Sequence, residues 1–319
     1  MSRVLTPLAQ AMHHMIYHVY SIWLFTLSDL KTIVVPQTAF GIIGALATSP
    51  EREWLPRLAQ VLARLPLVAC VVWMNLLPFA IDNQRRPAAI IEDKHTKPWR
   101  PMPSGRMSGD QAKNLMFGFY ILAFCISSVL GGIRQCLMLM LLGFCYNDLE
   151  LADWSWVTRN AINGLGFGCF ASAALEVAMG EPLSFDNHVA LFRWLGMIGG
   201  IVFTTVQTQD MADQEGDKLR ARKSMPLSIG DVPTRWITAV SMVSWSVVCP
   251  LYWGVGNSPL IAVVGLGLII ACRTLAFRSV QSDKLTFRLW NAWMVCLYVL
   301  PLLVREEFTT FRGQRWAVL

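Results

Sequence analysis

The sequence has few charged residues. Only 15% of its 319 residues are Asp, Glu, Lys or Arg, whereas 54% are hydrophobic. A soluble domain of this length needs more charge to cover its surface, and the mean hydropathy of +0.44 points the same way. The composition excludes an ordinary soluble protein and favours a membrane protein, whose helices satisfy their own backbone hydrogen bonds in lipid.

Several common signatures of function are also absent. The eight cysteines lie in apolar stretches and lack metal-site spacing, so we interpret them as core residues. There is no Gly-rich phosphate loop, zinc motif or Ser-His-Asp pattern. The net charge of +6 is spread over short loops, so nucleic acid is not expected as a partner. No obligate protein partner is evident. We expect no cleavable signal peptide, because Asp29 and Lys31 interrupt the first apolar stretch.

Apolar stretches that could cross a bilayer recur along the whole chain. We predict an all-α polytopic membrane protein with nine spans, at residues 32–48, 63–84, 112–131, 134–150, 157–178, 188–208, 233–255, 258–273 and 286–304. Residues 14–29, which contain several aromatic side chains, are predicted to form an interfacial helix within an N-terminal segment 1–31. No linker divides the sequence, so we expect one domain over residues 1–319.

The loops between these spans differ in charge. The N-terminus and the loops after the second, fourth, sixth and eighth spans share one side, which carries 19 of the 27 Lys and Arg residues. Positively charged loops remain in the cytosol during insertion. The pattern therefore predicts that this side, with the two most highly charged loops, faces the cytosol.

The second of these loops, residues 209–226, carries Asp210, Asp213 and Asp217. Their three-then-four spacing puts the three carboxylates on one helix face, where they would repel one another. A hard divalent cation such as Mg²⁺ would relieve the repulsion, and Mg²⁺ commonly bridges carboxylates to substrate phosphates. A solvated acidic loop end is the alternative. The cations that follow favour a diphosphate site instead; they are Arg220, Arg222 and Lys223.

The first loop, residues 82–106, likewise combines candidate metal ligands with cations. Its candidate oxygen ligands are Asn83, Glu92 and Asp93, and its candidate phosphate-pairing cations are Lys97, Arg100 and Arg106. Four prolines predict a rigid loop; they are Pro87, Pro98, Pro101 and Pro103. Topology charges are the alternative for the cations. Two facing acidic loops predict a binuclear or trinuclear Mg²⁺ site that would withdraw a diphosphate leaving group.

Two segments of the sequence, Asp93–Arg106 and Asp210–Pro226, resemble the two signatures of the UbiA superfamily of intramembrane prenyltransferases. Residues 146–148 and 159–160 are also similar to that family. The resemblance implies a helical bundle that uses Mg²⁺ and a prenyl diphosphate substrate. It implies Mg²⁺ ligands at Asn83, Glu92, Asp93, Asp210, Asp213 and Asp217. It implies diphosphate contacts from Arg100, Arg159, Asn160, Lys218 and Lys223.

The first signature departs from the family pattern. Counting back from Asp93 in steps of four, Ala89 and Arg85 stand where the family usually has an acidic residue and an Asn. This altered motif, together with residues 25–31, resembles the fungal UbiA-type terpene cyclases, which implies location in the endoplasmic reticulum membrane.

We therefore expect a membrane-bound terpene cyclase that ionises farnesyl or geranylgeranyl diphosphate. Tyr146 and Phe79, near the metal motifs, are the aromatic residues expected to stabilise the carbocation by cation–π attraction. A prenyltransferase with a separate acceptor is the alternative enzyme. A transporter or lipid-binding protein is the alternative outside enzymes, but it would place acidic groups near mid-membrane and often shows inverted repeats. Neither feature is found in the sequence.

Overall fold

The computed structural model describes residues 7–48, 54–185 and 188–304, which form helices joined by turns. Within these ranges, eight helices are long and apolar enough to cross a membrane. They are α2 (Val35–Ala47) with the π-helical turn Leu30–Val34, α4 (Leu65–Arg85), α6 (Gly109–Leu130), α9 (Trp156–Met179), α10 (Val189–Thr205) with its 3₁₀ extension Val206–Thr208, α13 (Asp231–Trp253), α14 (Asn257–Ala276) and α15 (Val280–Leu303).

The remaining predicted span is α7 (Ile133–Asn147). Its 15 residues reach only about 22 Å at 1.5 Å per residue, less than the roughly 30 Å of the hydrocarbon layer. All nine predicted spans are thus helices, and eight of them have full spanning length. The predicted interfacial helix is α1 (Pro7–Thr26), and a short helix, α3 (Trp54–Ala63), was not expected. The fold is that of an integral membrane protein.

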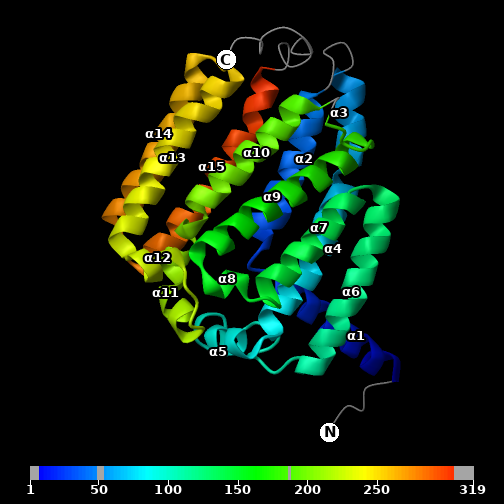
Figure 1. Cartoon of the computed structure of the whole chain (residues 1–319). Helices are drawn as coiled ribbons and strands as arrows, with labels where there is room; N and C mark the ends of the chain where they lie inside the picture. Colours follow the sequence, from blue (N-terminus) through cyan, green and yellow to red (C-terminus); the bar gives the residue numbers. More distant parts are fainter. Residues whose placement is uncertain (1–6, 49–53, 186–187, 305–319) are drawn as a thin grey trace.

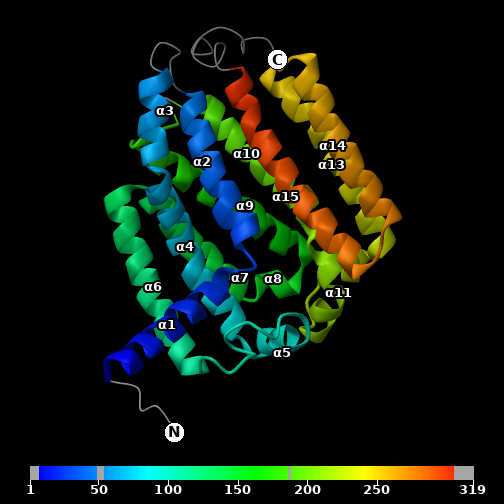
Figure 2. The same cartoon turned by 180° about the vertical axis from the view of Figure 1, so that it is seen from behind.

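Helices α2, α4 and α9 form the centre of the bundle (Figures 1 and 2). Helix α9 contacts α2, α4, α7 and α10, whereas α13 and α14 form an outer hairpin and α6 packs outside α4. Glycines allow the central helices to approach closely. A Cβ at Gly41 of α2 would lie 2.6 Å from the Ala174 carbonyl, and one at Gly164 of α9 would lie 2.7 Å from the Gly199 oxygen.

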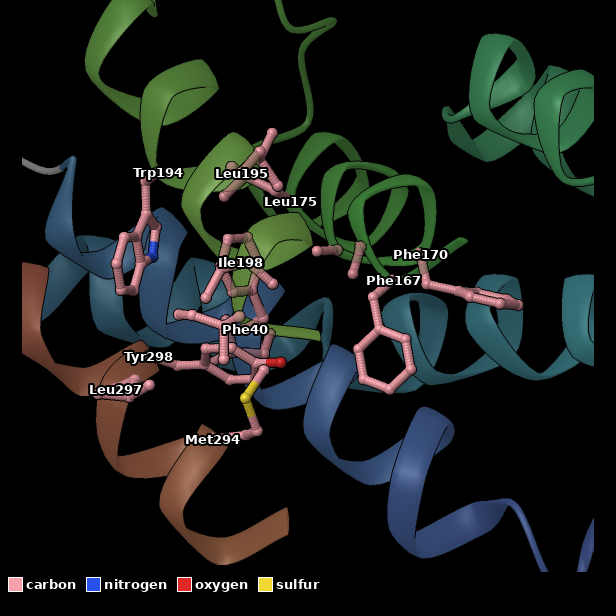
Figure 3. Packing of buried hydrophobic residues seen from close by; sticks show 14 of the residues in the cluster. Phe40, Phe167, Phe170, Leu175, Trp194, Leu195, Ile198, Met294, Leu297 and Tyr298 are labelled. Carbon is pink, nitrogen blue, oxygen red and sulfur yellow. The ribbon is translucent and has the colours of Figure 1, made fainter. Parts of the chain in front are cut away.

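Aromatic side chains fill the core between these helices (Figure 3). Phe40 of α2 meets Tyr298 of α15 edge to face, with ring centroids 5.0 Å apart. Phe167 and Phe170 extend from α9 away from this pair. Phe167 and Phe170 belong to this core and also line the cavity described below.

One end of the bundle is built from short helices: α5 (Pro87–Thr96), α8 (Leu151–Trp154), α11 (Asp210–Leu219) and α12 (Met225–Ile229). Helix α1 lies at the same end (Figures 1 and 2). Residues 87–96 of the predicted rigid proline loop form a helix, α5. Pro87 occupies the first turn of α5, where proline starts a helix because its missing N–H is not needed there.

The opposite end is held by Glu176, a buried carboxylate on α9. It accepts hydrogen bonds from the Gly132 amide at 3.1 Å and the Leu183 amide at 2.9 Å, and from the Arg134 guanidinium. It thereby joins three segments: the end of α9, the turn before α7 and the connection to α10. Its role is structural.

Replacing Glu176 by Ala should lower the free energy of unfolding by about 2–3 kcal/mol, because buried donors lose their partner. Thermal unfolding in detergent measures this loss. Glu181→Ala, at an exposed position five residues on, is the matched control and should change stability little. Equal stabilities of the two variants would contradict the structural role.

Candidate active site

A cavity of about 160 Å³ lies between the central helices and the short helices at the polar end. Its charged wall comes from α5, α11 and the ends of α4 and α9, and its apolar wall from the π-helical turn before α2 and from α4, α7 and α9. The lining includes Asp29, Ile33, Asn75, Phe79, Asn83, Glu92, Asp93, Lys97, Arg100, Leu139, Tyr146, Arg159, Ile162, Asn163, Gly166, Phe167, Phe170, Gln209, Asp213, Arg220 and Arg222. The cavity is therefore ionic at one end and hydrocarbon-like at the other.

The first acidic segment contributes three of the predicted metal ligands to this wall. Arg100 Nη1 lies 2.9 and 3.0 Å from the two carboxylate oxygens of Asp93. Asn83 Oδ1 accepts a hydrogen bond of 2.9 Å from Arg220 Nη1, which also lies 3.6 Å from Glu92 Oε2. The end of α4 and helix α5 thus present oxygen donors and guanidinium groups side by side.

The second acidic segment divides between two roles. Asp213 lines the cavity, and its carboxylate lies 3.6 Å from Lys97 Nζ. Asp210 and Asp217 lie behind the cavity wall, where Asp210 holds Arg159 at 2.7 Å and Asp217 holds Arg222 at 2.9 Å. Burial raises the pKa of the Asp210 carboxyl despite the opposing effect of Arg159. The one helix face expected for these three residues does form, as α11.

Three of the predicted diphosphate contacts lie away from the cavity lining. Lys218 and Lys223 are exposed, because they project from α11 and the following turn to the outside. Asn160 is buried, and its Nδ2 donates to Phe203 O at 3.0 Å and Gln207 Oε1 at 3.1 Å. It faces α10 instead of the cavity.

Other residues take these places in the lining. Arg220 and Arg222, which lie between the two exposed lysines in the sequence, line the cavity, and Asn163 lies at the cavity wall one turn beyond Arg159. A helical period counted from Arg159 would have indicated Asn163. Asp29 was also missed. Burial raises the pKa of its carboxyl, with Arg100 and Lys97 acting in the opposite direction.

Arg106, expected to pair with phosphate, has a different role. Its guanidinium lies 4.0 Å from the ring centroid of Tyr17 and 5.1 Å from that of Tyr20, and its Nε donates to Ser21 Oγ at 3.0 Å. All three partners belong to α1. Arg106 fastens α1 to the turn that follows α5 and is not among the residues that line the cavity.

The two predicted aromatic residues meet at the cavity wall. Phe79 of α4 and Tyr146 of α7 are edge to face, with centroids 5.3 Å apart. The Tyr146 hydroxyl accepts a hydrogen bond from Arg159 Nη1, so the phenol cannot turn freely. The structure thus places an oriented ring pair in the cavity wall beside the Arg159 guanidinium.

Carboxylates of this site could hold a metal ion. Among the described residues, no three His, Cys, Asp or Glu side chains lie close enough together to hold one as they stand. The donor chemistry nevertheless fits Mg²⁺, which prefers oxygen ligands. In addition, Asp217 Oδ2 is buried without a hydrogen-bond partner among the described residues.

The helices and the cavity define an integral membrane protein whose bundle encloses a site charged at one end and apolar at the other. The model of the UbiA prenyltransferase family matches residues 34–297. The chain therefore belongs to the UbiA prenyltransferase family, and it is an intramembrane enzyme that acts on prenyl diphosphates.

The curated relatives include two terpene synthases and a digeranylgeranylglyceryl phosphate synthase. The chain is 26% identical to fumagillin beta-trans-bergamotene synthase of Aspergillus fumigatus, over 89% of this chain and 92% of that protein. It is 26% identical to somaliensene A/B synthase of Streptomyces somaliensis, over 85% and 88%. It is also 26% identical to digeranylgeranylglyceryl phosphate synthase of Methanobrevibacter smithii, over 56% and 64%.

Solved structures share the fold. A UbiA homolog from Archaeoglobus fulgidus, bound to DMAPP and Mg²⁺, superimposes with a TM-score of 0.61 at 10% identity, covering 91% of this chain and 99% of that one. The identity is low, so this likeness supports the architecture of the bundle and not the chemistry of individual residues.

Proposed function

We propose that the protein is a membrane-bound terpene cyclase that ionises farnesyl or geranylgeranyl diphosphate and cyclises the resulting carbocation. The observation that carries the proposal is the cavity, whose ionic and aromatic ends match the two ends of a prenyl diphosphate. The similarity to bergamotene and somaliensene synthases over most of both chains favours cyclisation.

In this proposal the charged wall binds the diphosphate. Four residues of the cavity lining would bind Mg²⁺: Asn83, Glu92, Asp93 and Asp213. Asp210 and Asp217 would become further Mg²⁺ ligands when Arg159 and Arg222, which now pair with them, turn to the substrate. Bound Mg²⁺ would act as a Lewis acid on the leaving diphosphate. Arg100, Arg159, Arg220 and Arg222 would contact its oxygens. Lys218 and Lys223 would add positive charge from the surface.

The proposed reaction begins with heterolysis of the allylic C–O bond, whose electron pair leaves with the diphosphate. The cation remains in the apolar end of the cavity, where Phe79 and Tyr146 present their rings. Each desolvated ring stabilises a cation by roughly 1–2 kcal/mol. Attack by a double bond of the same chain closes the ring. Loss of a proton to the released diphosphate, or capture of water, ends the sequence.

The charge asymmetry of the loops supports a site open to the cytosol. We further propose the endoplasmic reticulum as its membrane, as the resemblance of the first motif to the fungal cyclases implies. Both placements let a water-soluble diphosphate reach the ionic end of the cavity while the hydrocarbon tail enters the bundle.

A prenyltransferase is the second candidate, because the archaeal relative is named as a digeranylgeranylglyceryl phosphate synthase. In that case the same ionisation would precede attack by an acceptor nucleophile in place of the substrate's own double bond. The two candidates share the ionic wall and differ only in what quenches the cation.

Incubation of membranes with Mg²⁺ and either farnesyl or geranylgeranyl diphosphate, without an acceptor, distinguishes them. We expect a cyclic hydrocarbon or alcohol and free diphosphate, with no product when EDTA replaces Mg²⁺. Membranes that lack the protein are the control. Turnover that needs an added acceptor would select the prenyltransferase, and no turnover under either condition would reject both candidates.

A further inference from the structure

Asp153 of the short helix α8 joins two cavity arginines. Its Oδ2 accepts a hydrogen bond of 3.0 Å from Arg220 Nε, and its Oδ1 accepts one of 2.8 Å from Arg222 Nε. Each carboxylate oxygen therefore serves one guanidinium. No sequence signature pointed to Asp153, which lies 67 and 69 residues before its two partners.

This arrangement leaves the outer nitrogens of both guanidinium groups for other ligands. Arg220 Nη1 reaches Asn83 Oδ1 at 2.9 Å, and Arg222 Nη1 reaches Asp217 Oδ1 at 2.9 Å. Both arginines line the cavity. The Asp153 carboxylate thus binds the Nε atom of each arginine, whereas the Nη1 atoms of the arginines contact Asn83 and Asp217 in the site.

The backbone around this junction is strained at two places. Glu150 and Ala221, with φ of 53° and 57°, are the non-glycine residues with positive φ among the described residues. Glu150 leads directly into α8, and Ala221 separates the two arginines. This conformation is unfavourable for a non-glycine residue, and such strain persists where the surrounding structure imposes it, often at functional sites.

The strain at Ala221 has a visible result. The chain reverses there, so that the Arg222 amide reaches Asp217 O at 2.9 Å and the Lys223 amide reaches Asp153 O at 3.0 Å. Backbone and side chain of Asp153 together hold the turn after α11. Both arginines consequently face α8, although they are only two residues apart.

We propose that Asp153 is a positioning residue that presents Arg220 and Arg222 to the diphosphate of the substrate. The proposal rests on the proposed function, because it assumes that a diphosphate binds at this wall. Asp153, which does not itself line the cavity, would set the orientation of the two arginines that bind the ligand. Burial of the Asp153 carboxyl would raise its pKa, but Arg220 and Arg222 outweigh this effect and lower the pKa, so the carboxylate is charged at neutral pH.

The test compares Asp153→Asn with the wild-type protein in two measurements. The first is the affinity of the purified protein for inorganic pyrophosphate with Mg²⁺, by calorimetry. The second is the KM and kcat for the prenyl diphosphate. We expect 10- to 100-fold weaker pyrophosphate binding and a similar rise in KM. Asp153→Glu, which keeps the charge, should recover at least part of the affinity.

The matched control is Glu150→Gln, which removes one negative charge from an exposed side chain three residues before Asp153. It should leave pyrophosphate affinity unchanged. A purely structural role would reduce the amount of folded protein and hence the apparent kcat, with KM and affinity preserved. That result in Asp153→Asn would overturn the proposal. If Asp153→Asn does not fold, Asp153→Ser, which also removes the carboxylate, takes its place in both measurements.

The outcome also separates this proposal from the proposed function. Wild-type protein that binds pyrophosphate and turns over substrate, together with an unaffected Asp153→Asn variant, would reject only the role of Asp153. Wild-type protein that neither binds pyrophosphate nor turns over prenyl diphosphate would reject both.

Discussion

Asp213→Asn should lower kcat/KM for the prenyl diphosphate by about 10²–10³-fold, the typical loss when one electrostatic group of a charged transition state is removed. Asp213 lines the cavity, and its cationic neighbour Lys97 lies 3.6 Å away. This contact is looser than the arginine pairs of Asp93 and Asp210. Glu92 has an equally long contact with Arg220, but its side chain is only 8% exposed, compared with 21% for Asp213. The Asp213 carboxylate is therefore the one most available to a metal ion, and its loss should disturb the fold least. Steady-state kinetics at saturating Mg²⁺ measures the effect.

The control for Asp213→Asn is Glu215→Gln on the same helix. Glu215 is exposed and does not line the cavity. The control variant therefore loses one negative charge two residues further along α11 and should keep full activity. Thermal unfolding should be alike for both. Equal activity of the two variants would remove Asp213 from the metal site.

Gly166→Leu should change the choice of substrate and product more strongly than any other apolar substitution in α9. Gly166 lines the cavity, and a Cβ built on it meets nothing within 4 Å. A leucine there would therefore project into the space that receives the hydrocarbon chain. Overfilling a packed space costs about 1–3 kcal/mol, so kcat/KM should fall roughly 10- to 100-fold for the longer substrate and less for the shorter one.

Gly168→Leu is the control for this substitution. Gly168 also has open space at its Cβ but does not line the cavity. Gas chromatography of products from farnesyl and geranylgeranyl diphosphate distinguishes the two variants. An unchanged substrate ratio and product profile in Gly166→Leu would show that the hydrocarbon chain does not pass α9 at this point.

The pairing of carboxylates with arginines has a simple electrostatic origin. Acidic groups that converge without a cation repel one another and would take up protons, and a buried charge is costly unless it is paired. Arg159 and Arg222 meet this need for Asp210 and Asp217. Binding of Mg²⁺ and a diphosphate would exchange partners, since carboxylates can then turn to the metal and guanidinium groups to the phosphate oxygens.

The sequence alone predicted the helices and the charged end of the molecule. Spans follow from the length of apolar runs, which depends on the bilayer and not on tertiary contacts. The spacing of Asp210, Asp213 and Asp217 likewise predicted one helix face, and α11 forms over these residues. Family membership was also recognisable, because each signature motif is a continuous segment that can be read directly from the sequence.

The directions of side chains were decided only by the tertiary structure. The sequence does not distinguish the two lysines, Lys218 and Lys223, from the two arginines between them. The turn at Ala221 and the hydrogen bonds to Asp153 direct the arginine side chains to the cavity. Asn163 lines the cavity and Asn160 does not. Such outcomes depend on which face of a helix packs against its neighbours and on charges far away in the chain. Local spacing places residues on a face, but partners from distant segments determine what that face contacts.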